Sequence, residues 1–93
     1  MADEFAKYVQ SRNFTVKVKL DTAGRKGKQV TVLDGLPKQE LFLAELVKSL
    51  KKLCGAGGTY VLDKKDGVVE LQGDHRDRVC GFLEKHQMKF VRT

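Results

Sequence analysis

The sequence predicts an α+β domain, a two-layer sandwich in which a mixed, mostly antiparallel sheet carries two helices on one face. The predicted order of elements is ββαββαβ. Two pairs of segments with alternating apolar and polar residues are each joined by a glycine-bearing turn, and a segment with apolar residues at helical spacing follows each pair. Right-handed crossover connections then place both helices on the same side of the sheet.

The length of 93 residues allows one domain with a single modest core. We expect residues 14–93 to form this domain as a monomer. Residues 1–13 are expected to be an N-terminal arm: the spacing of Phe5, Tyr8 and Val9 fits a short docked helix, and a mobile segment is the alternative. With 41% hydrophobic and 32% charged residues, the composition is that of a globular protein.

The charge balance points to an anionic partner. The formal net charge is +6, which favours nucleic acid first, with acidic lipid or protein as the alternatives. The apolar runs are too short for a transmembrane helix, and the first ten residues lack the apolar stretch of a secretion signal. We therefore expect a cytoplasmic protein that has no contact with membranes.

The first predicted hairpin has strands on either side of a polar, glycine-bearing loop over residues 21–28. Its apolar positions, which alternate with polar ones, are Val16, Val18, Leu20, Val30 and Val32. In this pattern Thr31 belongs to the solvent-facing set, because it alternates with the two valines beside it.

The first predicted helix follows Pro37, which suits a first helical position, and ends before Gly55, a residue typical of helix C-termini. The predicted apolar stripe consists of Leu43, Leu46, Val47, Leu50, Leu53 and Cys54. The opposite face carries Glu45, Lys48, Lys51 and Lys52. The sequence therefore predicts an amphipathic helix with a basic outer face.

The second predicted hairpin joins residues 59–62 to residues 68–72 through Asp66-Gly67, a strong turn signal. Val69 and Leu71 are expected to face the core. The second helix follows, with an apolar face made by Val79, Phe82, Leu83 and His86. A short strand over residues 89–92 completes the prediction.

Four charged residues surround the predicted start of the second helix. After Gly73 breaks the strand, Asp74 is predicted as the N-cap and Asp77 as its capping-box partner. Capping gives no use to Arg76 and Arg78, whose charge in a first helical turn opposes the helix dipole. We therefore assign these two arginines to function.

Enzymatic chemistry is not expected. No nucleophile–base pair and no spaced carboxylates stand out. The four residues that could ligate zinc, Cys54, His75, Cys80 and His86, lack the spacing of zinc sites, so no metal is predicted and the cysteines are expected to be free thiols. The glycines at 55, 57 and 58 follow a helix, whereas phosphate-binding glycine loops precede one, so no nucleotide cofactor is predicted.

Three stretches together resemble the family of eukaryotic translation initiation factor one, with its archaeal and bacterial YciH-like relatives. They are GRKGKQVTVLDGL (Gly24 to Leu36), LKKLCGAGGT (Leu50 to Thr59) and LQGDHRDRV with its continuation CGFL (Leu71 to Leu83). The resemblance covers about residues 15–92. It implies a non-enzymatic domain that binds ribosomal RNA of the small ribosomal subunit near the P site, beside the initiator tRNA, and contributes to start-codon selection.

The resemblance also implies where RNA is contacted. It implies contacts at Arg25, Lys26 and Lys28 in the first loop and at Lys48, Lys51 and Lys52 on the first helix, and its G-D-x-R element matches Gly73, Asp74 and Arg76. Arg76 and Arg78, which the dipole argument assigns to function, complete the expected RNA-binding set. Gly73, Asp74 and Asp77 are expected to support the second helix. The alternative is a general RNA-binding or stress-related translation regulator built on the same domain.

Overall fold

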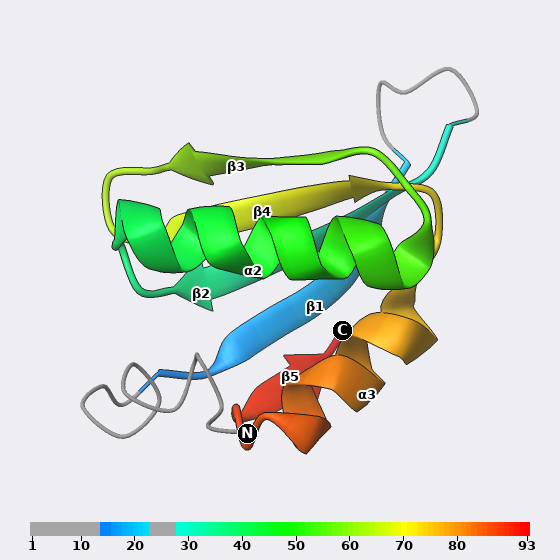
Figure 1. The fold of residues 1–93 in the computed structure, drawn as a ribbon. Helices are drawn as coiled ribbons and strands as arrows, with labels where there is room; N and C mark the ends of the chain where they lie inside the picture. The colour runs from blue at the N-terminus through cyan, green and yellow to red at the C-terminus, as the bar shows by residue number, and fades with distance from the viewer. Residues whose placement is uncertain (1–13, 23–27) are drawn as a thin grey trace.

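The computed structural model describes residues 14–22 and 28–93, and the expected arm over residues 1–13 lies outside them. Along these residues the elements are β1 (Val16–Asp21), β2 (Val30–Leu36), α2 (Glu40–Cys54), β3 (Gly58–Leu62), β4 (Gly67–Gln72), α3 (Arg76–Lys85) and β5 (Phe90–Arg92) (Figure 1). This is the predicted order, and the second hairpin begins within one residue of its predicted bounds.

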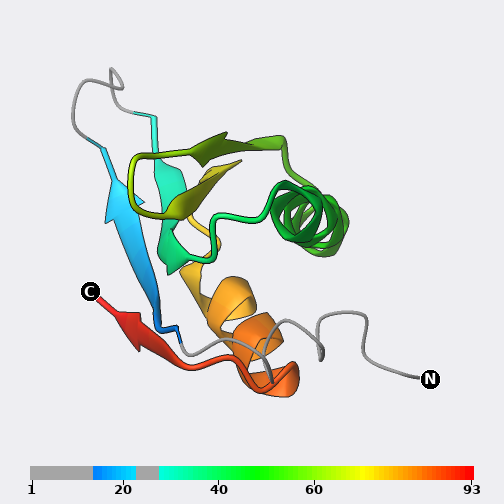
Figure 2. The ribbon, with the colours of Figure 1, turned by 90° about the vertical axis from the view of Figure 1, so that its left-hand side faces the viewer.

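The strands form one mixed sheet in the order β3-β4-β2-β1-β5. Only the pairing of β1 with β5 is parallel; the other three pairs among the described strands are antiparallel. The crossovers through α2 and α3 start from antiparallel strands and run toward opposite edges. Right-handed connections therefore put both helices on one face, and Figure 2 shows them on the same side of the sheet. The predicted fold class is confirmed.

The core lies between this face and the two helices. Helix α2 buries Phe42, Leu43, Leu46, Val47 and Leu50, which confirms most of the predicted stripe. The last turn differs, since Leu53 is 41% exposed and Cys54 is half-buried. The start also differs: Pro37 lies three residues before the helix, in a tight turn where the Gln39 N–H donates to the Pro37 carbonyl at 2.8 Å.

Strand β2 corrects the predicted hairpin pattern. Leu33 lies opposite Val18 and both belong to the core, so Thr31 also faces the helices and is fully buried. Val32 lies on the other face, between Lys19 of β1 and Glu70 of β4, and is still only 6% exposed. A central strand is shielded on both faces, so its alternation does not tell which set faces the helices.

A bulge at Gly35 then changes the phase of β2. The pairing with β4 shifts between Leu33 and Leu36, so that Leu36 returns to the core. Gly35 has φ +76°, and a Cβ there would lie 2.6 Å from the Thr15 carbonyl oxygen. Only glycine fits this position, because the left-handed backbone and the close approach both exclude a side chain.

The two described helices, α2 and α3, are not long and apolar enough to cross a membrane.

Candidate nucleic-acid interface

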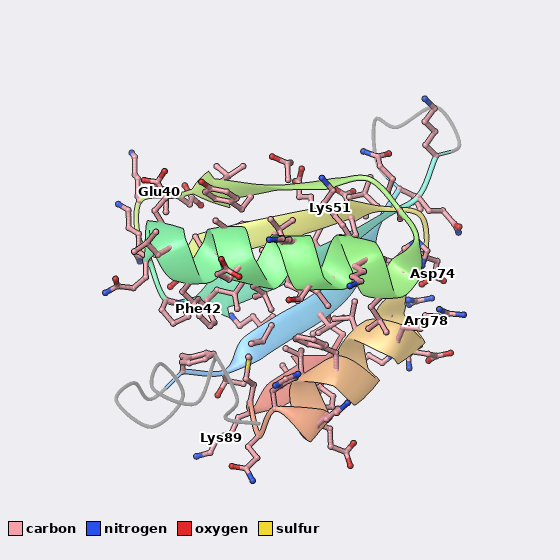
Figure 3. The ribbon with its side chains drawn as sticks, viewed as in Figure 1. Glu40, Phe42, Lys51, Asp74, Arg78 and Lys89 are labelled. Carbon is pink, nitrogen blue, oxygen red and sulfur yellow. The ribbon has the colours of Figure 1, made fainter. Side chains whose placement is uncertain are left out.

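The outer face of α2 carries three exposed lysines, Lys48, Lys51 and Lys52. Lys51 is labelled in Figure 3. These lysines face solvent because the opposite side of the helix packs in the core. Within residues 14–22 and 28–93, no carboxylate forms an ion pair with any of them. Gly55 ends the helix in a left-handed conformation, with its N–H donating to the Lys51 carbonyl. Lys51 and Lys52 thus lie in the last turn, where the helix dipole favours cations.

The first loop is only partly described. Lys28 is exposed, two residues before the start of β2. Arg25 and Lys26 lie outside the described residues, so their assignment stays a prediction.

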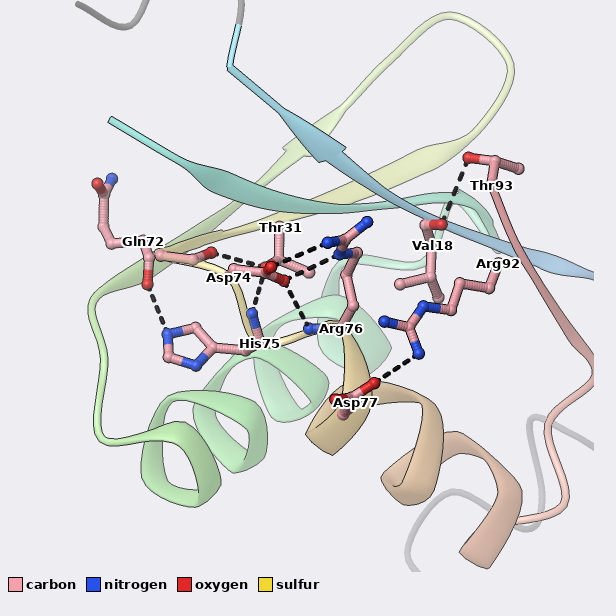
Figure 4. Close-up of polar contacts among 10 residues, drawn as sticks. Val18, Thr31, Gln72, Asp74, His75, Arg76, Asp77, Arg92 and Thr93 are labelled. Carbon is pink, nitrogen blue, oxygen red and sulfur yellow. Dashed lines mark hydrogen bonds and ion pairs between the residues drawn. The ribbon is translucent and has the colours of Figure 1, made fainter. Parts of the chain in front are cut away.

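A buried hydroxyl fixes the turn that precedes α3. The Thr31 hydroxyl donates to the Gly73 carbonyl at 2.7 Å and accepts the His75 N–H at 2.8 Å (Figure 4). Gly73 has φ +95°, and a Cβ there would lie 2.9 Å from His75 Nε2, so this position requires glycine. His75 Nε2 also lies 2.7 Å from the Gln72 carbonyl oxygen. The start of α3 is therefore tied to the centre of the sheet.

The capping prediction was wrong in its details. Helix α3 begins at Arg76, and its N-cap residue is His75, which makes no side-chain capping bond to any described residue. Asp74 lies one position earlier and accepts the Arg76 N–H at 3.3 Å, a turn-type contact. Asp77 does not complete a capping box; its carboxylate pairs with Arg92 of β5 at 2.5 Å.

Both arginines that were assigned to function alone have structural partners. The Arg76 guanidinium donates two bonds of 2.9 Å to the Asp74 carboxylate. These bonds lower the pKa of Asp74 and raise that of Arg76. The Arg78 guanidinium donates to the Leu53 carbonyl at 3.1 Å, at the end of α2. The premise that these side chains lack a structural use is overturned, whereas their RNA-binding role is untested.

A groove of about 610 Å³ lies between the two helices and brings together two of the predicted cations, Lys52 and Arg78. Lys85, which was not singled out in the sequence, is the third cation of this groove. Its spacing from Arg78 is seven residues, or two helical turns, which places both on one face of α3.

The two cysteines, Cys54 and Cys80, are free and half-buried. Burial raises the pKa of both thiols, and Arg78 opposes this at Cys54. They are therefore held as thiols rather than as the thiolates that react or bind metal.

Comparison with known proteins agrees with the motifs. The family "Translation initiation factor SUI1" matches residues 12–89. "Uncharacterized protein YciH" of Escherichia coli is 43% identical over 74 residues, which are 80% of this chain and 65% of that protein. Two archaeal proteins called "Protein translation factor SUI1 homolog" are also similar. The protein of Hyperthermus butylicus is 45% identical over a region that covers 73% of this chain and 61% of that protein. The protein of Sulfolobus acidocaldarius is 43% identical over a region that covers 75% of this chain and 66% of that protein.

The matched region thus spans a little less than two thirds of these relatives. The chain belongs to the translation initiation factor SUI1 family, which confirms the resemblance seen in its three stretches.

Proposed function

We propose that this protein is a non-enzymatic translation initiation factor that binds the small ribosomal subunit near the P site and contributes to start-codon selection. Ribosomal RNA is contacted through basic surfaces. The observation that carries the proposal is the exposed lysine face of α2, which forms no ion pair with a carboxylate of the described residues, in a chain that belongs to the SUI1 family. Phosphates are the ligands that such exposed, unneutralised cations attract most strongly.

Other cations extend this surface. Lys28 is exposed in the first loop, and Arg25 and Lys26 belong to the same loop in the sequence. Arg76 and Arg78 already contact Asp74 and Leu53 at the start of α3. Because their geometry is set before any ligand arrives, these arginines are suited to position phosphates rather than to supply mobile charge.

The test is binding of small ribosomal subunits as a function of salt. Replacing Lys48 and Lys51 by Ala removes two exposed charges without touching the core. We expect weaker binding, and a slope of log affinity against log salt that is shallower by about 0.7–0.9 for each lost phosphate contact. Replacing Arg25 and Lys26 by Ala is expected to have the same kind of effect.

The matched control is the pair Lys64 and Lys65, which are also exposed and lie in the turn between β3 and β4. Replacing both by Ala changes the net charge equally. An unchanged slope in this control, together with a shallower one in the Lys48/Lys51 variant, supports a local contact. Equal losses in both variants would assign the effect to net charge and sink the proposal for α2.

Sedimentation of the protein on a ribosome density gradient distinguishes this function from that of a general RNA-binding regulator. A start-codon factor is expected to co-migrate with free small subunits, and its basic-face variants are expected to raise initiation at a near-cognate start codon in a reporter. Association with RNA of every size class, without such an effect, would favour the regulator.

A further inference from the structure

The groove between α2 and α3 is built from two facing helical surfaces. Its lining residues are Ser49, Lys52 and Leu53 from α2 and Arg78, Gly81, Phe82, Lys85 and His86 from α3. On each helix these positions recur at three- and four-residue steps, so they share one face. Its volume of about 610 Å³ lies within the range of small-ligand sites.

The charge of the groove selects an anion. Lys52, Arg78 and Lys85 line it, and none of the described lining residues is Asp or Glu. The Arg78 guanidinium is oriented by its bond to the Leu53 carbonyl. Three cations around a partly enclosed space favour a ligand with more than one negative charge, such as consecutive phosphates.

The groove also offers aromatic surface. The rings of Phe82 and His86 lie 4.3 Å apart, tilted by 42°, and both residues are half-buried. Leu53 is the single aliphatic side chain among the described lining residues. A peptide helix needs a row of apolar contacts, whereas aromatic faces beside cations are the elements that bind single-stranded nucleic acid.

Gly81 is the residue that the fold itself does not explain. It lies inside α3, where glycine is less stable than alanine by about 0.5–1 kcal/mol. A Cβ at this position would meet no atom of the described residues within 4 Å. Packing against the described residues therefore does not require glycine here, whereas a ligand that approached the helix backbone closely would require it.

From these observations we infer that the groove binds one unstacked nucleotide of single-stranded RNA. The base lies against the Phe82–His86 ring pair and over Gly81, and the flanking phosphates meet Lys52, Arg78 and Lys85. The inference rests on the proposed function as an RNA-binding factor and adds to it a site that reads an exposed base, beyond the phosphate contacts of the lysine face.

The probe is a fluorescein-labelled uridine or adenosine octamer, with an abasic ribose-phosphate octamer as the ligand control. The main variant is Gly81→Leu, which fills the groove from a position where the fold leaves room. We expect Gly81→Leu to weaken octamer binding about tenfold or more, since stacking of one base contributes about that much. Phe82→Leu is expected to give a similar loss, and the wild type is expected to bind the abasic octamer as weakly as the variants bind RNA.

Two controls keep the result specific. Thr59→Leu adds the same side chain at an exposed position of β3, outside the groove, and is expected to bind octamers as the wild type does. Gly81→Ala is expected to raise the melting temperature while weakening octamer binding, a combination that damage to the fold cannot produce.

Several outcomes would overturn the inference. The first is octamer binding that Gly81→Leu leaves unchanged, and the second is an equal affinity of the wild type for the RNA octamer and the abasic octamer. A polyglutamate peptide serves as a third probe: if Gly81→Leu weakens binding of this peptide alone, the groove is a site for acidic protein segments. Small-subunit binding by the wild type is measured separately. If small-subunit binding is retained while the groove variants bind the octamer as the wild type does, the inferred nucleotide site is rejected and the proposed function stands.

Discussion

The two helices are attached to the same sheet face by different physical means. Helix α2 buries five apolar side chains, whereas α3 buries only Val79 and Leu83. Polar contacts hold α3 instead. Thr31 and Asp74 bind the backbone at its start, Arg78 joins it to α2, and Asp77 joins it to β5.

The comparison separates stability from placement. Apolar burial is non-directional and tolerates small shifts, so it makes α2 a stable platform for its exposed lysines. Hydrogen bonds need defined distances and angles, so they fix where α3 and its arginines lie relative to α2. The groove between the helices depends on this second kind of contact.

The largest expected effect tests the first half of the comparison. Leu46→Ala in α2 removes a fully buried side chain from the middle of the core, and we expect it to lower the free energy of unfolding by about 2–5 kcal/mol in denaturant titration. Leu83→Ala, the same change in α3, is expected to cost less because fewer buried side chains of that helix surround it. Equal losses would mean that both helices are anchored by their cores.

A medium effect is expected at Thr31. Thr31→Val keeps the shape of the side chain but leaves the His75 N–H and the Gly73 carbonyl without their partner, and we expect a loss of about 1–3 kcal/mol. Hydrogen exchange should become faster at the His75 amide. Thr31→Ser keeps the hydroxyl and is expected to keep that amide protected, even though it removes a methyl group. A slow His75 amide in the Val variant would show that α3 is not held in this way.

The smallest effect is expected at the exposed pair Asp74–Arg76. Hydrogen bonds from Arg76 hold the pKa of Asp74 below its ordinary value. A carboxylate with a lowered folded-state pKa stabilises above its unfolded-state pKa of about 3.9, and this contribution disappears as the pH falls through the folded-state value. Asp74→Asn is therefore expected to lower the melting temperature slightly at pH 7 and to equal the wild type in strong acid. A constant difference at every pH would exclude the ion pair as the cause.

The sequence was sufficient for the order of elements, for most of the buried face of α2 and for its end at Gly55, because apolar periodicity and a C-terminal glycine are local signals. It failed where the answer depended on distant partners. The start of α3 is set by Thr31, more than forty positions away in the chain, so local capping rules placed it too early. The bulge at Gly35 lies against the carbonyl of Thr15, the residue before β1, and no local pattern predicts that close approach.

The candidate site shows the same division. The exposed lysines of α2 were predicted because the spacing of its apolar residues defines a solvent-exposed face on the opposite side. The groove was not predicted, because it depends on the position of the two helices relative to each other. Lys85 and Gly81 carried a usable signal, since they lie seven and three residues after Arg78 and therefore share its helical face. Thr31 carried none, because an alternating strand does not state which of its faces is covered.

The parallel pairing of β5 with β1 has a consequence for how the domain folds. It joins Val16 to Phe90, and the Val16 N–H donates to the Lys89 carbonyl at 2.9 Å. The hairpin of β3 and β4 closes over a few residues, whereas this pair closes a loop that contains every other described element. Because loop-closure entropy grows with sequence separation, we expect the β1–β5 pair to form later than the β3–β4 hairpin. On this expectation the half of the sheet under α2 assembles first, and β5, the strand beside α3, pairs with β1 afterwards.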